Sequence, residues 1–407
     1  MTTAKKLILS IAACSVLTAA AQEAPRTAYF LDGYSYRHEL NPAFAGERNY
    51  ISIPVLANMD MSLFSNVGVN TFLYKTQPGS QYKLTTFMSP TVDANTFLNK
   101  LGNSNHINGN FDFTILSTGF RAFKGYNTIS VGVHAGMGVD IPKDFFAFMK
   151  LGQTGPDTHY HFDDLKLQAS AMAEIALGHS HRINDKLNIG AKVKVLLGVG
   201  NVSAHLKNMD VMFGHDKWQI QADGELMMAA GSGLYVPTKA EAGKDFDKPA
   251  DADLIDWGDI DYDKFGLAGF GLGFDLGATY QLLPDLELSA AINDLGFMNW
   301  NNAVTGRTGT GTWTFDGFNN IAIDSSQDGY EENKLDKQLD RMWDDIQDVI
   351  NIHREKDGTG AYTQALHATL RIGAEYKMPF YKKLTGGFLF SSHFAGCSCH
   401  RETGEMV

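Results

Sequence analysis

The stretch FGLGFDLGATYQ (residues 270–281) alternates strictly between two kinds of side chain. Phenylalanine, leucine, alanine and tyrosine occupy the even positions, while glycine, aspartate, threonine and glutamine occupy the odd positions. Successive side chains of a β-strand point to opposite faces, so this pattern predicts a strand with one apolar and one polar face. The stretch exceeds the typical globular strand of about 5–6 residues and reaches the roughly 9–11 that a tilted membrane strand needs.

The same alternation recurs along the chain and predicts nine strands, at 51–71, 110–122, 128–139, 166–181, 187–201, 266–282, 286–295, 363–378 and 384–394. The segment 204–228 is also β-like and is interpreted as a hairpin beyond these strands or as a strand extension. Short connections (123–126, 182–186, 283–285 and 379–383) alternate with long ones (74–108, 140–165, 203–264 and 297–361). Outer-membrane barrels show this alternation, with short periplasmic turns and long outer loops.

The N-terminus has the pattern of an export signal. Lys5 and Lys6 precede an apolar run at 7–17, and a row of small residues ends at Ala21. The run is too short to cross a bilayer as a helix, so we predict a signal peptide cleaved near Ala21. Lipoprotein processing at Cys14 is the alternative, and the sequence leaves it open.

The bulk composition narrows the class of protein. The chain has 407 residues, 41 glycines, 11 prolines and a net charge of −12 without a basic stripe, which disfavours a nucleic-acid partner. Three cysteines give no disulfide framework. After the signal, no uncharged apolar run reaches about 18 residues, so no membrane-spanning helix is expected. Besides a membrane-spanning helix, a closed β-barrel is the structure in which all backbone N–H and C=O groups can be hydrogen-bonded in lipid.

We therefore predict an all-β fold, an antiparallel outer-membrane β-barrel with long outer loops that carry short helices. The predicted parts are a signal peptide (1–21), a periplasmic N-terminal segment or hatch (22–49), a barrel domain (50–394) and a polar tail (395–407). A soluble β-sandwich is the alternative, but its strands would be shorter. Nine spans is an odd number, whereas bacterial single-chain barrels have an even one. We therefore expect the chain to be truncated before barrel closure.

The segment TAYFLDGYSYRHELNPAFA (27–45) resembles the start of an uncharacterised family of outer-membrane barrels from the Bacteroidetes. Further matches are LSTGFRAFKG (116–125), DLGATY (275–280) and DLGF (294–297). The Asn-Pro-Ala step is similar to the N-terminal hatch of FadL-type fatty-acid transporters and to the start of PorP/SprF-type barrels of gliding and secretion machinery. The resemblance implies a barrel fold and export to the outer membrane, and it names no activity.

The alternation predicts which side chains line the barrel interior. The lumen-lining candidates are the charged residues on the polar faces of the strands: Asp112, Glu174, Lys192, Lys194, Asp275, Glu287, Arg371 and Glu375. The resemblance to FadL-type barrels implies that Asn41 and Pro42 seat a hatch. The alternative is a plain turn before the first strand, because proline restricts the residue that precedes it.

No metal site or cofactor is expected. The weak candidate is an acidic loop that contains Asp251, Asp253, Asp259 and Asp261. Its spacing differs from that of a calcium loop, so a solvated acidic loop is favoured. Two further groups, His159 with His161 and Cys397 with Cys399 and His400, lack a complete four-ligand spacing.

Two loop segments have helical patterns. Leu335, Leu339, Trp343, Ile346 and Ile350 follow helical spacing, which predicts an amphipathic helix within 328–356 that caps the barrel or binds a partner. The alternative is that this helix packs on its own barrel. A second short helix is predicted at 143–151, where phenylalanines cluster.

The functional expectation has two forms. The first is uptake or binding of a small apolar solute through the barrel. The second is a structural or docking barrel that serves a secretion or gliding machinery, with machinery proteins as partners. Outer-membrane lipid is the expected surrounding in both. No nucleotide-binding or hydrolase motif stands in a suitable context, so no enzyme is expected.

Overall fold

The computed structural model describes residues 26–394, except 32, 45, 47, 54–57, 77–82, 156, 247–248, 310, 319–320, 323–325, 327–328 and 381–383. The predicted signal peptide, Cys14 and the predicted polar tail with Cys397, Cys399 and His400 lie outside the described residues.

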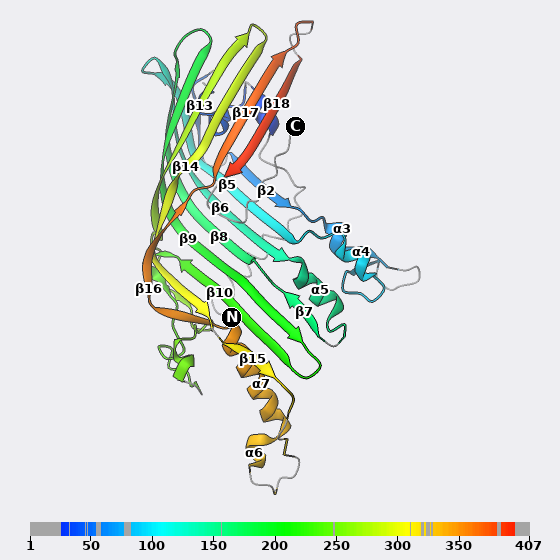
Figure 1. Ribbon diagram of the computed structural model, residues 1–407. Helices are drawn as coiled ribbons and strands as arrows, with labels where there is room; N and C mark the ends of the chain where they lie inside the picture. Colours follow the sequence, from blue (N-terminus) through cyan, green and yellow to red (C-terminus); the bar gives the residue numbers. More distant parts are fainter. Residues whose placement is uncertain are drawn as a thin grey trace.

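Fourteen strands form one large antiparallel sheet, and the prediction of an all-β fold is confirmed. Figure 1 shows this sheet curving around the dark-blue N-terminal elements. Its principal strands are β1 (Tyr50–Ser52), β2 (Met59–Ser65), β5 (Ser104–Ala122), β6 (Gly125–Pro142), β8 (Leu165–Arg182), β9 (Leu187–Phe213), β13 (Gly269–Leu283), β14 (Leu286–Thr308), β17 (Ala368–Lys377) and β18 (Thr385–Phe394). Among the described strands, β18 pairs only with β17, while β1 and β2 pair only with β5.

The predicted short connections are tight hairpins at one end of the sheet. Ala122 pairs with Gly125, and Leu283 pairs with Leu286. Phe123 and Lys124 have φ angles of 54° and 59°, the left-handed pair that a two-residue hairpin turn uses to match strand twist. The prediction of short turns at 123–126 and 283–285 is therefore confirmed.

The long connections contain more β-strand residues than the alternation predicts. Strand β9 continues to Phe213 and β14 to Thr308, so the predicted ends of these strands at 201 and 295 are wrong. The added length pairs with β10 (Trp218–Ala229), β7 (Thr158–His161) and β16 (Ile352–Ala365), and β15 (Thr312–Phe315) pairs in turn with β10. The β-like segment 204–228 is thus a hairpin formed by the extension of β9 and by β10, in which Trp218 of β10 pairs with Phe213 of β9.

The first predicted strand, 51–71, is interrupted. Asn66 ends it, because its Oδ1 accepts the His106 N–H and its amide donates to the Ser104 carbonyl, both at 2.9 Å. The Asn66 N–H still donates to the His106 carbonyl at 3.3 Å, but the side chain takes the place of the second backbone bond of this pair, and the chain turns away. The prediction is wrong beyond this point, where the structure has α3 (Val69–Phe72), β3 (Leu73–Lys75), β4 (Leu84–Thr86) and α4 (Ala94–Leu98).

Helix α5 (Lys143–Leu151) matches the predicted helix at 143–151. The helix predicted within 328–356 is α6 (Tyr330–Asn333) followed by α7 (Leu335–Ile350), and the prediction is wrong after Ile350, where β16 begins. Met342, Ile346 and Val349 of α7 pack against Ala222 and Trp313 of the sheet extension. This helix therefore lies on its own sheet through one apolar edge.

The remaining short elements lie before the sheet and in the long connections. Their bounds are η1 (Arg26–Phe30), α2 (Arg37–Leu40), η2 (Gly231–Gly233), β11 (Leu234–Tyr235), η3 (Pro249–Asp253) and β12 (Asp261–Tyr262). Arg354 of β16 donates to the Glu241 carboxylate and to the Val236 carbonyl, which fixes the connection after β11. The hydrogen bonds from Arg354 also lower the pKa of Glu241 below its usual value.

The two faces of the sheet differ in chemistry. We call residues 26–44 the inner segment. The face of the sheet that this segment contacts is the inner face. The opposite, outer face is covered by exposed apolar side chains; examples on adjacent strands are Leu177, Val193, Phe274, Leu288 and Ile372. Phe274 and Ile372 each expose 45% of their surface, whereas Asp275, next to Phe274 in the chain, is fully buried on the inner face. No α-helix in the described part of the chain has the length and apolarity to span a bilayer.

Candidate functional site

The inner segment is fixed to the sheet by hydrogen bonds to strands far along the chain. Tyr29 donates its hydroxyl to Ser289 Oγ at 2.9 Å, and Asn41 donates its amide to the Ala290 carbonyl at 3.3 Å. Asn41 Oδ1 accepts the Ala43 N–H at 2.9 Å, which closes a turn. Asn41 is fully buried, and burying a carboxamide without hydrogen-bond partners costs free energy. These bonds provide the partners.

Two glycines make room for the turn at Asn41 and Pro42. A Cβ atom at Gly190 would collide with the Pro42 carbonyl, and one at Gly277 would collide with the Asn41 amide. Gly190 of β9 pairs with Gly277 of β13, so the two glycines form one seat on the inner face. Such a seat is what a hatch requires, and the hatch role of Asn41 and Pro42 itself stays a prediction.

Arg37 joins the inner segment to one of the predicted interior carboxylates. Its Nη2 lies 3.9 Å from Glu375 Oε2. Its Nε donates to the Tyr29 carbonyl at 3.0 Å, and its guanidinium lies 4.1 Å from the centre of the Phe44 ring. Glu287, the neighbouring candidate, pairs with Glu375 across β14 and β17 and is half-buried.

Farther from the tight turns, charged side chains form a continuous row across seven strands of the inner face. We call this row the ionic belt; its members are Asp112, His134, Glu174, Lys192, Lys194, Asp275, Asp294 and Arg371. Six of them were predicted as lumen-lining from the alternation. His134 and Asp294 were not.

His134 connects the first carboxylates of the belt. Its Nδ1 lies 2.6 Å from Asp112 Oδ1, and its Nε2 lies 3.5 Å from Glu174 Oε2. The same glutamate oxygen lies 3.7 Å from Lys194 Nζ. The three strands β5, β6 and β8 are thereby linked to β9 through side chains as well as through backbone pairs.

Lys194 is the centre of the belt. Its Nζ lies 2.6 Å from Asp294 Oδ1 and 3.0 Å from Asp275 Oδ2. Only 8% of the Lys194 side chain is exposed, and none of the Asp275 side chain is. Lys192 Nζ lies a further 3.9 Å from the same Asp275 oxygen. The carboxylates compensate the buried ammonium, because a buried charge without an opposite partner would be strongly unfavourable there.

Asp294 enters the belt because the strand is irregular at that position. Its φ angle is 61°, and the pairing of β13 with β14 shifts register between Phe274 and Leu276. The Asp294 N–H donates to Asp275 Oδ1 at 2.8 Å, which holds the irregularity in place. A β-bulge of this kind changes the face to which the following residues point. Asp294 therefore faces inward although strict alternation assigns it to the apolar face.

The belt ends at Arg371 and there meets the inner segment. Arg371 Nη1 donates to Asn293 Oδ1 at 2.8 Å. The amide of Asn293 donates in turn to the Glu39 carbonyl at 3.2 Å, and Asn293 is almost fully buried. A carboxamide thus relays between the guanidinium on β17 and the backbone of α2.

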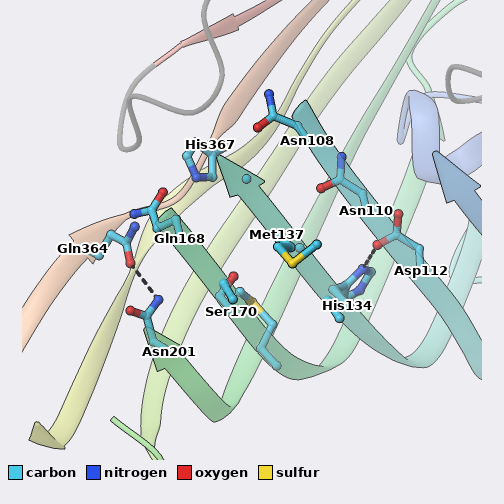
Figure 2. A pocket seen from close by; sticks show the side chains of 15 residues that line it. Asn108, Asn110, Asp112, His134, Met137, Gln168, Ser170, Asn201, Gln364 and His367 are labelled. Carbon is cyan, nitrogen blue, oxygen red and sulfur yellow. Dashed lines mark hydrogen bonds and ion pairs between the residues drawn. The ribbon is translucent and has the colours of Figure 1, made fainter. Parts of the chain in front are cut away.

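A polar pocket of about 190 Å³ opens beyond the belt, toward the long connections. We call it the amide pocket, because carboxamides dominate its polar lining: Asn108, Asn110, Gln168, Asn201 and Gln364, with Ser170, His134, His367 and Asp112. Figure 2 shows these side chains along one face of neighbouring strands, with the Asp112–His134 pair at one end and the Asn201–Gln364 bond at the other.

The inner face therefore has three layers along each strand. On β9 the order from the tight turn is Gly190 at the inner segment, Lys194 in the belt and Asn201 in the pocket. On β8 the order is Ser180, which donates to the Ala43 carbonyl, then Glu174, then Gln168. The belt thus separates the inner segment from the pocket.

The acidic loop has no cluster of three or more possible metal ligands among the described residues. Asp259 instead lies 2.9 Å from Lys244 Nζ. Asp251 is buried in η3, Asp253 ends the same turn, and Asp261 lies in the short strand β12. Likewise His161 bonds Asp210. These side chains therefore have structural partners.

Comparison with known proteins gives one result. No curated protein and no solved structure matches the chain significantly. Residues 42–402 match a family whose description is "Family of unknown function (DUF5723)". The matched region starts at Pro42, the residue seated against Gly190, and includes every strand of the sheet. The protein therefore belongs to the DUF5723 family.

Proposed function

We propose that this protein is an outer-membrane β-barrel protein in which the inner segment closes the periplasmic side of the barrel and the amide pocket receives a small solute from the outer side. The observation that carries the proposal is the inverted sheet. Its outer face exposes rows of large apolar side chains, while its inner face buries two lysines, Lys192 and Lys194, and the carboxylates of Asp275 and Glu375. A water-soluble sheet has the opposite arrangement.

The energetics of the outer face favour lipid over water. Burying one leucine, isoleucine or phenylalanine side chain stabilises by about 1.5–3 kcal/mol. The outer face exposes such residues on β8, β9, β13, β14 and β17 together, so the patch far exceeds the few hundred Å² that soluble monomers tolerate. Hydrocarbon would remove this cost from every one of these strands.

The strand lengths support the same setting. Strands β5, β6, β8 and β13 have 19, 18, 18 and 15 residues, above the roughly 9–11 that a tilted membrane strand requires. Tight hairpins gather at one end and long connections at the other, as in outer-membrane barrels. The inner segment lies at the end with the tight turns, which is periplasmic in this orientation.

The lining of the pocket refines the expected solute. The expectation from the sequence is a small apolar solute, whereas carboxamides dominate the polar lining of the amide pocket. Because the inner segment packs on the inner face on the far side of the belt from this pocket, we expect passage through the protein to require movement of the inner segment. Binding at the outer side requires no such movement.

A second candidate function is the docking barrel of a surface machinery. Helix α7 favours it, because Leu335, Leu339 and Trp343 stay exposed while its other apolar edge packs on the sheet; Trp343 exposes 59% of its surface. Purification in mild detergent distinguishes the two functions. A docking barrel retains partner proteins and loses them when Trp343→Ala is introduced, whereas a solute-binding barrel purifies alone.

Quenching by brominated lipid tests the membrane setting. Phe274→Trp and Ile372→Trp place a reporter on the outer face, and we expect their added emission to be strongly quenched because both positions contact hydrocarbon in the proposed orientation. Thr312→Trp on β15, beyond the predicted spans, is the matched control and should be quenched far less. The emission of the five native tryptophans is subtracted in each case. Equal quenching at all three positions would contradict the proposal.

A further inference from the structure

We infer that the amide pocket binds a neutral, polyhydroxylated solute about the size of one sugar ring. The inference rests on the proposed function for the side from which the solute arrives, namely the outer side. The binding chemistry itself follows from the lining of the pocket.

The polar lining matches hydroxyl groups. A carboxamide both donates and accepts hydrogen bonds, and so does a sugar hydroxyl. Asn108 and Asn110 come from β5, Gln168 and Ser170 from β8, and Gln364 from β16, so such groups meet the solute from several sides. A solute with hydroxyls around a ring can engage several of these strands at once.

One wall of the pocket is held in place before any solute binds. Tyr362 donates its hydroxyl to Asn201 Oδ1 at 2.6 Å, and the Asn201 amide donates to Gln364 Oε1 at 3.4 Å. The buried Trp300 donates its indole N–H to the same Gln364 oxygen at 3.2 Å. These bonds use the carbonyl oxygen of Gln364 and not its NH₂ group. A fixed carboxamide loses little conformational freedom on binding, which favours affinity.

The charges of the lining favour a neutral solute. Asp112 is the only carboxylate among the lining residues, and His134 already binds it at 2.6 Å. No lysine or arginine lines the pocket, so phosphates and carboxylates find no strong cationic partner there. The apolar part of the lining comes from Met137, Met172 and two alanines, and it supplies a surface against which the carbon ring of such a solute can pack.

The size of the pocket sets an upper limit on the solute. Its volume is about 190 Å³, below the roughly 300–1,000 Å³ of pockets for drug-sized ligands. A single ring or a short polyol is compatible with this room. Longer saccharides would have to extend past Asn201 toward the long connections.

Saturation-transfer NMR on the full chain in lipid nanodiscs tests the inference. The probes are D-glucose, D-galactose and N-acetyl-D-glucosamine, with octanoate and inorganic phosphate as competing chemistries. We expect saturation transfer to at least one sugar, with affinity weakened about tenfold in Asn110→Leu and in Ser170→Val, the equivalent of one lost hydrogen bond. Asn208→Leu, an exposed asparagine on the β9 extension, is the matched control and should bind as wild type.

Each outcome of this experiment either supports or overturns the inference. Sugar binding that weakens in the two pocket variants but not in the control supports the inference. The inference is overturned if no sugar shows transfer, if octanoate or phosphate binds instead, or if sugar binding is the same in all variants. Ser170→Val replaces the hydroxyl with a methyl group and adds only one further methyl, so it keeps the test valid if Asn110→Leu fails to fold. Quenching by brominated lipid on the same preparations reports the proposed membrane setting separately, so failure of one is distinguishable from failure of the other.

Discussion

Replacing Lys194 with methionine is expected to lower the free energy of unfolding by about 3–5 kcal/mol, the usual cost of removing one partner from a buried ion pair. Lys194 lies within 4 Å of Glu174, Asp275 and Asp294, and its side chain is only 8% exposed. Without the ammonium, three carboxylates stay close together on the inner face. Urea titration of the protein in lipid vesicles, followed by tryptophan emission, measures the loss.

Two further variants make this prediction specific. Lys207→Met also removes a lysine from β9, but the Lys207–Glu225 pair is over 40% exposed on both sides and should contribute less than about 1 kcal/mol. Adding Asp294→Asn to Lys194→Met removes one uncompensated charge and should recover part of the loss. Equal effects of Lys194→Met and Lys207→Met would show that the belt is not stabilised as a unit.

Gly190→Ala is expected to unseat the inner segment. The added Cβ collides with backbone atoms of Pro42 and Ala43, which cannot move aside as a flexible side chain does. Overpacking of this kind costs about 1–3 kcal/mol. We expect trypsin to cleave after Arg37 much faster than in the wild type, where the Arg37 side chain is only 12% exposed. A time course of digestion in vesicles, read by mass spectrometry, measures this.

Gly200→Ala is the matched control on the same strand. A Cβ at Gly200 meets only ordinary contacts, the nearest being the Ala229 carbonyl at 3.5 Å. This variant should leave the cleavage rate unchanged. Its free energy of unfolding should rise by the roughly 0.5–1 kcal/mol by which alanine is more stable than glycine inside a strand. Similar protection of Arg37 in both variants would mean that the glycine seat does not hold the segment.

The main strands of the sheet can be predicted from the sequence because one physical rule governs them. Alternation of period two places side chains on two faces, and the residues of 270–281 follow it throughout. The rule also places six of the belt residues on one face. It gives no information on strand ends, because β9 continues past Gly200 and Asn201, two residue types that are common in turns, into an extension that ends at Phe213.

The rule fails where the backbone leaves the regular pleat. Asp294 adopts a left-handed conformation at a bulge, so the residues that follow it change face: Met298 and Trp300 point inward and Phe297 outward. The sequence gives only a weak sign of this change of face, namely the apolar residues at the odd positions 295 and 297. His134 was detectable in principle as the lone titratable residue on the polar face of 128–139.

The amide pocket and the seat of the inner segment lay beyond sequence reasoning for another reason. Asn201 and Gln364 are 163 residues apart, and their meeting depends on how β14 and β16 pair beyond the belt. Likewise nothing local to Gly190 indicates that the carbonyl of Pro42 lies against it. Such contacts follow from the assembled curvature of the sheet.

The seating of the inner segment also sets an order of events in folding. Tyr29 and Ser289 are separated by 260 residues, and Asn41 and Ala290 by 249. The segment is synthesised before any of these partners, and it cannot be fixed until β14 exists. Closing loops of that length is entropically costly and slow. The inner segment is therefore synthesised before the strands but is among the last parts to acquire its native contacts. Until then it must remain soluble and accessible on its own.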